Sequence, residues 1–204
     1  TDPACAAIFF VHHPLSLETG IAAAEARYFA DLESRLWRAA DGVIGASPHT
    51  ARAVITAGAS PEAVVVASPG VDLVEPVARV MRDAVSTQAV RLLCVATLTA
   101  RKGHRDLIEA LAPHRALGWS LDCVGSTERD PATTEAVRGL IAHFGFEQQI
   151  RLHGELSDAA LDQLWREADL FVLPSYHEGY GMVFTEAIAR GVPVIATRAG
   201  AIPE

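Results

Sequence analysis

The sequence predicts an α/β fold in which parallel sheets are covered by helices on both faces. Short apolar runs, typical of buried strands, alternate throughout the chain with segments whose apolar residues recur at helical spacing. This strand–helix alternation favours parallel pairing, because a helix is the usual connection between parallel strands. The length of 204 residues is sufficient to bury a sizeable core as one large or two small domains.

The first part of the chain, 1–72, contains the elements of one such domain. Strands are expected at 6–11, 42–46 and 64–66, and helices at 18–40 and from 48 to about 57. The long helix is predicted from the helical spacing of its apolar residues, which are Ile21, Tyr28, Leu32 and Leu36. Ser47 followed by Pro48 is typical of a helix N-terminus.

A polar, irregular stretch at 73–89 is the expected linker to a second domain at 90–204. In this second domain the expected strands are 90–96, 119–124, 150–153, 170–173 and 192–196. The expected helices are 105–111, 131–144, 157–168 and 183–190. Gly191 is a helix stop before the last of these strands.

The most informative segment joins the strand at 170–173 to the helix at 183–190 and reads PSYHEGYGMVFTEA. It places two carboxylates, Glu178 and Glu186, on either side of a glycine-rich turn. A helix N-terminus after such a turn exposes backbone N–H groups suited to a phosphate. Carboxylates do not bind phosphate, so their natural partners are hydroxyl groups. Together these features point to a sugar nucleotide.

This segment resembles the E-x7-E signature of the retaining glycosyltransferases of family four. The match runs from Pro174 to Thr197 and resumes at 200–204, with Tyr180 in place of the usual Phe and Met182 in place of the usual Leu. The resemblance implies a GT-B fold with two Rossmann-like domains. It also implies a longer enzyme, of which this chain is expected to be a fragment with both domains incomplete.

Lys102 is the only lysine of the chain and lies in a loop between a predicted strand and a predicted helix. In an open parallel sheet, ligands bind outside the carboxyl ends of the strands, and an ammonium there can pair with a diphosphate. Arg101 can add a forked contact. The family carries a Lys-Gly here as well, but often has an arginine where this chain has Thr97. Arg101 would then have to replace it.

The resemblance implies roles for both carboxylates and for the turn between them. Glu186, expected in the first turn of its helix, accepts hydrogen bonds from the ribose hydroxyls. Glu178 approaches the donor sugar. The backbone N–H groups at the helix start face the β-phosphate, and two glycines allow the ligand to come close. These residues are Gly179, Gly181, Met182 and Val183.

Two histidines, His12 and His13, end the first predicted strand. Members of the family place a histidine of the first domain beside the donor sugar, and His12 matches it better. Glu18 is a candidate for contact with the acceptor. The backbone at His153 and Gly154, at the end of another strand, is a candidate for contact with the nucleobase.

The chain shows no pattern of metal ligands, so neither a metal nor a cofactor beyond the donor is expected. Its three cysteines, Cys5, Cys94 and Cys123, share no ligand spacing and are interpreted as buried, reduced thiols of a cytoplasmic protein. The net charge of −8 argues against nucleic acid as a partner but allows contact with the inner face of a membrane. No apolar run has the roughly 20 residues of a spanning helix.

The sequence therefore predicts transfer of a sugar from a nucleoside diphosphate to an acceptor hydroxyl, with retention at the anomeric carbon. The acceptor is unknown and could be a sugar, a lipid-linked molecule or a small molecule. Alternatives within the same fold are a sugar-nucleotide epimerase and a phosphorylase. The latter is disfavoured because its pyridoxal phosphate needs a lysine and the single lysine is already assigned. A further alternative is a nucleotide-sugar-binding fragment without activity.

Overall fold

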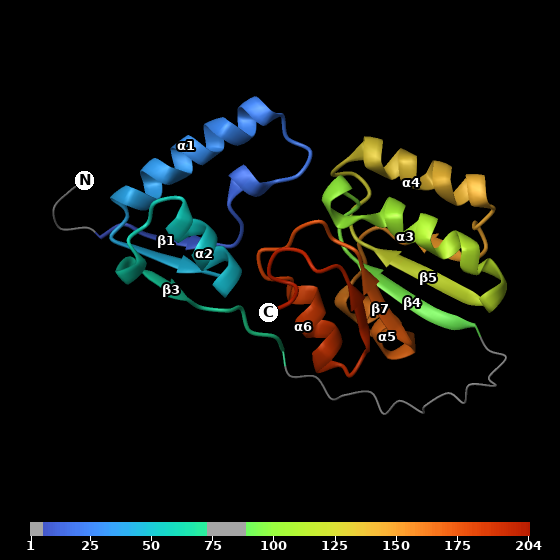
Figure 1. Cartoon of the computed structure of the whole chain (residues 1–204). Helices are drawn as coiled ribbons and strands as arrows, with labels where there is room; N and C mark the ends of the chain where they lie inside the picture. Colours follow the sequence, from blue (N-terminus) through green and yellow to red (C-terminus); the bar gives the residue numbers. More distant parts are fainter. Residues whose placement is uncertain (1–5, 73–88) are drawn as a thin grey trace. The chain divides into compact units, whose positions relative to one another are not determined.

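A computed structural model describes residues 6–72 and 89–204, which form two compact units. Unit 1 contains the chain up to Gly70 together with 176–182 and 198–204. Unit 2 contains 71–175 and 183–197. Each unit is built of parallel strands and helices (Figure 1), which confirms the predicted α/β class.

Unit 1 has a sheet of three parallel strands in the order β1-β2-β3. Its elements are β1 (Ile8–Val11), a 3-10 turn (Leu15–Leu17), α1 (Ala23–Ala39), β2 (Gly42–Gly45), α2 (Pro48–Thr56), a 3-10 turn (Pro61–Ala63) and β3 (Val64–Val66). The core packs Trp37 of α1 and Val54 of α2 against the strand residues Val11 and Val43. As expected, Ser47 is the N-cap of α2, and its hydroxyl oxygen accepts a hydrogen bond from the Thr50 N–H.

Unit 2 has a sheet of five parallel strands in the order β6-β5-β4-β7-β8. Its strands are β4 (Val90–Val95), β5 (Trp119–Val124), β6 (Ile150–Leu152), β7 (Leu170–Leu173) and β8 (Val194–Ala196). Its α-helices are α3 (His104–Leu111), α4 (Pro131–Phe144), α5 (Asp158–Glu167) and α6 (Met182–Ala189). Helices α3 and α4 lie on one face of the sheet and α5 and α6 on the other (Figure 1).

The strand order of unit 2 reverses between β4 and β7, which neighbour each other although they are far apart in the chain. Chain segments leaving two such strands turn to opposite faces of the sheet, so a crevice opens at their carboxyl ends. The loops that follow β4 and β7 carry the predicted donor-binding residues. The topology therefore brings these loops to the edge where doubly wound sheets bind ligands.

The largest difference from a predicted start is at α1; β1 and β8 each begin two residues later than expected and α5 one residue later. Helix α1 starts at Ala23, whereas the sequence predicted a start at Glu18. Gly20 has a φ of +84°, which interrupts a right-handed helix. The preceding 3-10 turn is held instead by Glu33 of α1, whose carboxylate accepts hydrogen bonds from the Leu15 N–H and the Ser16 hydroxyl. Local backbone geometry and a distant side chain thus set this boundary.

Two segments of the expected second domain, 176–182 and 198–204, are grouped with unit 1. The Thr50 hydroxyl donates to the Gly179 carbonyl at 2.9 Å, and the His49 N–H donates to the Glu204 carboxylate at 2.9 Å. Of the expected linker, 73–88 lies outside the described residues. None of the helices within 6–72 and 89–204 is long and apolar enough to cross a membrane.

Candidate functional site

The loop after β4 carries the two predicted diphosphate-binding cations, Arg101 and Lys102. Both are half-buried and lie in a 3-10 turn (Ala100–Lys102) that ends at Gly103. Gly103 has a φ of +69°, and a Cβ on it would come within 2.2 Å of the Pro174 carbonyl oxygen. Only glycine fits this position, because the loop after β4 packs directly on the loop after β7. The close approach of Gly103 to Pro174 fixes the position of the backbone at the neighbouring Lys102.

The loop after β7 leads into α6, whose first backbone N–H groups are directed away from the body of the helix, as at any helix N-terminus. Gly181, with a φ of +87°, precedes Met182, the first residue of the helix, and Val183 follows. This fully described helix has no acidic residue in its first turn. No carboxylate of the first turn therefore neutralises the partial positive charge at the N-terminus of α6. An anion-binding site needs this charge to remain available.

Glu186 lies in the second turn of α6, so its predicted place in the first turn was wrong. Glycine at 181 lets the chain enter the helix one residue earlier than expected. Burial raises the pKa of the half-buried Glu186 carboxyl, Arg190 opposes this rise, and Asp72 adds to it. The shift is opposite to the lowering that a helix N-terminus would cause. A favourable interaction with the helix dipole therefore does not explain why a carboxylate is present at position 186.

A cavity of about 360 Å³ opens at the carboxyl ends of β4 and β5. It is lined by Val95, Ala96, Thr97, Val124, Gly125, Ser126, Glu155 and Leu156. The predicted donor-binding residues are not among these. Sequence reasoning did not assign Ser126 or Glu155, although both follow predicted strands, which is the signal that could have found them. The cavity has the position and polar groups expected of a ligand site in a doubly wound sheet.

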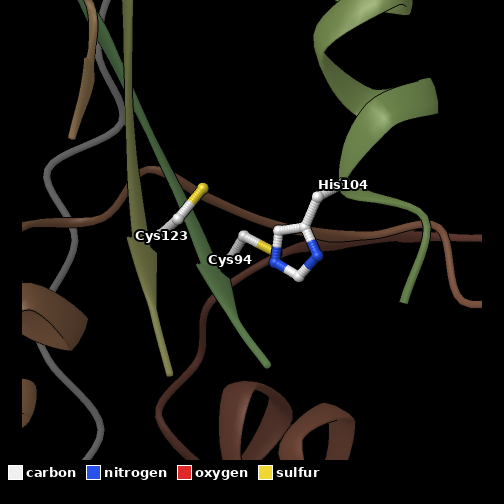
Figure 2. Close-up of side chains that lie close together, drawn as sticks. All are labelled: Cys94, His104 and Cys123. Atoms are coloured by element: carbon white, nitrogen blue, oxygen red, sulfur yellow. The ribbon is translucent and has the colours of Figure 1, made fainter. Parts of the chain in front are cut away.

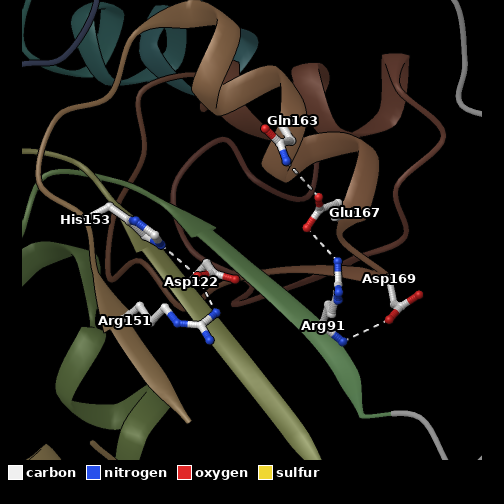
Figure 3. A network of polar contacts seen from close by, with 7 residues as sticks. All are labelled: Arg91, Asp122, Arg151, His153, Gln163, Glu167 and Asp169. Atoms are coloured by element: carbon white, nitrogen blue, oxygen red, sulfur yellow. Dashed lines mark hydrogen bonds and ion pairs between the residues drawn. The ribbon is translucent and has the colours of Figure 1, made fainter. Parts of the chain in front are cut away.

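Gly154 and His153, predicted near the nucleobase, directly precede in the chain the cavity-lining residues Glu155 and Leu156. The Gly154 carbonyl accepts a hydrogen bond from the Gly125 N–H, which ties the loops after β5 and β6 together. The His153 Nε2 is 2.7 Å from the Asp122 carboxylate, which also pairs with Arg151 (Figure 3). Since the ring of His153 is paired with Asp122, the backbone of His153 is the part of this residue that we expect a ligand to contact.

Figure 3 also shows a second polar network, where the guanidinium of Arg91 pairs with Glu167 and its backbone N–H donates to Asp169. Gln163 donates to the other oxygen of Glu167. Arg91 is at the start of β4, at the opposite end of the strand from the loop that carries Lys102. This network therefore joins α5 to the sheet away from the candidate site.

In unit 1, the turn at Glu178 and Gly179 packs on the end of β1. A Cβ on Gly179 would lie 1.9 Å from the His12 carbonyl oxygen, so the two backbones are in direct contact. Glu178 is only 6% exposed, unlike an ordinary surface-turn residue, and its backbone carbonyl accepts a hydrogen bond from the Ala201 N–H. The His12 side chain is exposed, with its ring edge against Phe10. The structure thus brings the backbone of His12 against that of Gly179, the residue that follows Glu178.

Three histidines without an assigned role gather beside this turn. The ring of His177 lies 4.7 Å from that of His13 and 5.4 Å from that of His49. His13 also pairs with Glu18, its Nε2 lying 3.6 Å from the carboxylate. Glu18, the candidate for contact with the acceptor, therefore pairs with His13, which matches the histidine of the family less well than His12 does.

A group of possible metal ligands lies behind the loop after β4, where the sequence analysis expected none. The side chains of Cys94, His104 and Cys123 are all buried, and their ligand atoms lie within 4.8 Å of one another (Figure 2). The hydrogen bond from Cys123 lowers the pKa of Cys94, burial opposes this, and His104 lowers it further. The same thiol pairing, followed by burial, raises the pKa of Cys123. Sequence spacing missed the group because two strands and a helix bring it together.

Comparisons with known protein sequences show similarity to glycosyltransferases. A family model described as "Glycosyl transferases group 1" matches residues 89–204. An MMP alpha-(1->4)-mannosyltransferase of Mycolicibacterium hassiacum is 30% identical over 95% of this chain and 48% of its own length. A D-inositol 3-phosphate glycosyltransferase of Corynebacterium efficiens is 33% identical over 71% of this chain and 37% of its own length. The chain thus spans at most about half the length of these relatives.

Solved structures show the same fold. The Alr3699/HepE protein of Anabaena, solved with UDP and glucose, superposes with a TM-score of 0.76 at 24% identity, covering 96% of this chain and 54% of that protein. Sucrose-phosphate synthase of Thermosynechococcus elongatus superposes with a TM-score of 0.78 at 24% identity, covering 96% and 51%. These likenesses place the two units in the GT-B fold class.

Proposed function

Because the chain belongs to the family of group 1 glycosyl transferases, we propose that the protein transfers a sugar from a nucleoside diphosphate to an acceptor hydroxyl with retention at the anomeric carbon. The observation that carries the proposal is the pair of loops that follow β4 and β7, the two strands between which the strand order reverses. One bears the only lysine of the chain, and the other opens α6 without an acidic residue in its first turn. Both features favour a bound diphosphate.

The donor is held mainly by unit 2 in this proposal. Lys102 and Arg101 pair with the diphosphate, and the N–H groups of Gly181, Met182 and Val183 add fixed dipoles. Glu186 accepts hydrogen bonds from the ribose. The cavity at the ends of β4 and β5 supports a place for the remainder of the nucleotide, since it is formed by the strand ends that bind nucleotides in such sheets.

The resemblance to retaining enzymes supports roles for Glu178 and His12 at the donor sugar. Departure of the nucleoside diphosphate leaves positive charge on the anomeric carbon and negative charge on the phosphate. Cationic side chains and helix N–H groups stabilise the negative charge as it develops, which is commonly the largest contribution to the rate. The acceptor proton passes to the departing phosphate, so no separate base is required. Transfer is expected to proceed without a metal ion or an added cofactor.

The donor site can be tested by thermal unfolding with UDP, GDP and ADP. A nucleotide at about one hundred times its dissociation constant stabilises a folded protein by roughly 2.7 kcal/mol. For a chain of this size that is a rise in Tm of roughly 5–10 °C. Lys102→Ala removes a charge-assisted contact and is expected to weaken the nucleotide about tenfold or more. Arg105→Ala, an exposed cation of α3, is the matched control and should change little.

Stabilisation by one base, reduced in Lys102→Ala and kept in Arg105→Ala, is the expected outcome. A cooperative transition that none of the three nucleotides moves would overturn the proposed donor site. Product analysis with the complete protein then separates the reactions. An epimerase converts the sugar nucleotide without an acceptor, and a silent binding protein leaves it unchanged.

A further inference from the structure

Three side chains from separate elements of unit 2 converge behind the loop that carries Lys102. Cys94 lies on β4, Cys123 lies on β5, and His104 is the first residue of α3. The two cysteines are direct partners in the parallel register of their strands. Figure 2 shows the sulfur of Cys94 beside the imidazole ring of His104, with Cys123 on the neighbouring strand.

The spacing of these atoms suits a tetrahedral zinc ion. The Cys94 Sγ lies 3.6 Å from the His104 Nε2. Zinc binds thiolate sulfur at about 2.3 Å and imidazole nitrogen at about 2.0–2.1 Å, so a tetrahedral angle separates the two ligand atoms by about 3.6 Å. All three ligand atoms lie within 4.8 Å of one another, which keeps Cys123 within reach of the same ion. The donors need only small side-chain movements to bind it.

The chemistry of the donors selects the type of metal. Two sulfurs and an imidazole bind zinc well, whereas magnesium and calcium prefer oxygen ligands. Both cysteines are free thiols, and no disulfide competes for them. Polar groups buried as deeply as His104, which is 2% exposed, are costly unless they have a strong partner.

We propose that Cys94, His104 and Cys123 bind one Zn²⁺ ion, with a neutral water molecule as its fourth ligand. On binding, the two thiols release their protons to solvent and the neutral imidazole coordinates through Nε2, so the site holds Zn²⁺ with two thiolates and carries no net charge. The ion joins β4 and β5 to the first residue of α3. Its role is structural: it holds the start of α3, and with it the turn at Lys102, against the sheet.

The site is buried, so the ion is taken up as the chain folds. The test is therefore to unfold the purified chain in a chelator, refold it with one equivalent of Zn²⁺, remove unbound metal and measure zinc by mass spectrometry. About one ion per chain is expected for the unaltered protein. Cys94→Ser, Cys123→Ser and His104→Gln should each lower the retained zinc at least tenfold. Cys5→Ser and the exposed His114→Gln are matched controls that should retain it.

A second measurement protects the test against variants that fail to fold. The unaltered chain refolded with Co²⁺ should show the absorption bands of cobalt bound to thiolate, and excess Zn²⁺ should abolish them. A chain that refolds cooperatively yet retains neither metal would overturn the proposal, as would a Cys94–Cys123 disulfide in the native protein. Equal zinc in all five variants would place the metal elsewhere. Because no nucleotide is present, these outcomes are independent of the proposed transferase activity.

Discussion

At the scale of single residues, the half-buried carboxyl of Glu186 favours a binding role over a role in stabilising its helix. The family resemblance assigns it to the ribose hydroxyls, and its place in the second turn of α6 removes the simpler explanation by the helix dipole. Burial raises its pKa, against the opposing influence of Arg190. A carboxylate kept half-buried at some cost in stability is typical of a residue retained for binding.

The raised pKa predicts a pH-dependent effect of Glu186→Gln. A carboxyl whose pKa is higher in the folded state favours folding at low pH, and this contribution is lost as the pH rises through the folded-state pKa. The variant, neutral at every pH, should therefore unfold at a higher temperature than the unaltered protein at pH 7 and at about the same temperature near pH 4. Thermal scans across this range measure the difference. An equal gain at both pH values would exclude an electrostatic origin, and the exposed Glu109→Gln is the control.

At the scale of elements, the turn between β7 and α6 is held by backbone contacts within unit 1. Gly179 touches the His12 carbonyl, and its own carbonyl accepts from the Thr50 hydroxyl. Glu178 is bonded through its carbonyl to the Ala201 N–H. These contacts place the end of β1, the start of α2 and the chain after β8 around one turn. The rigidity of this turn therefore depends on the absence of a side chain at position 179.

Substitution of two glycines tests this dependence. In Gly179→Ala the new methyl group would meet backbone 1.9 Å away, which forces the turn to move and is expected to cost about 1–3 kcal/mol of stability. Gly139→Ala, inside α4, meets no described atom within 4 Å and should add about 0.5–1 kcal/mol. Urea unfolding followed by circular dichroism measures both. A Gly179→Ala protein as stable as the unaltered chain would contradict the contact.

At the scale of the whole molecule, residues 6–72 and 89–204 form two compact units, each with its own parallel sheet. The five-stranded sheet of unit 2 contains the strand reversal and the cavity, whereas the three-stranded sheet of unit 1 contains the turn at Glu178. The family model matches residues 89–204, and the likeness to the GT-B fold extends over 96% of the chain. The proposed nucleotide contacts, however, are concentrated in unit 2. The two units should therefore respond differently to the donor nucleotide.

Hydrogen exchange with the nucleotide selected by thermal unfolding tests this difference. Exchange of amides in the loops after β4, β5 and β6 should slow by up to about 100-fold at one hundred times the dissociation constant, since bound ligand opposes opening by that factor. Amides in the centre of the β1-β2-β3 sheet should change little. Mass spectrometry of proteolytic fragments resolves the two regions. Protection confined to unit 1 would contradict the assignment of the donor to unit 2.

The α/β class and most strands and helices, to within a few residues, could be predicted from the sequence alone, and so could a candidate site at loops after parallel strands. These features are local, because apolar periodicity, N-caps and glycine stops act over a few residues. The Ser47 cap of α2 and the stop at Gly191 are examples that the structure contains. The family motif likewise occupies one continuous segment and could be read without a fold.

Only the tertiary structure decided which distant residues meet. It set the late start of α1 through Glu33, grouped the turn at Gly179 with unit 1, and lined the cavity with residues from three strand ends. It also brought two cysteines and a histidine together, although their spacing in the chain suggests no ligand set. The physical reason is the same in each case. Contacts between elements depend on strand order and register, which packing of the whole core selects and no local pattern of residues contains.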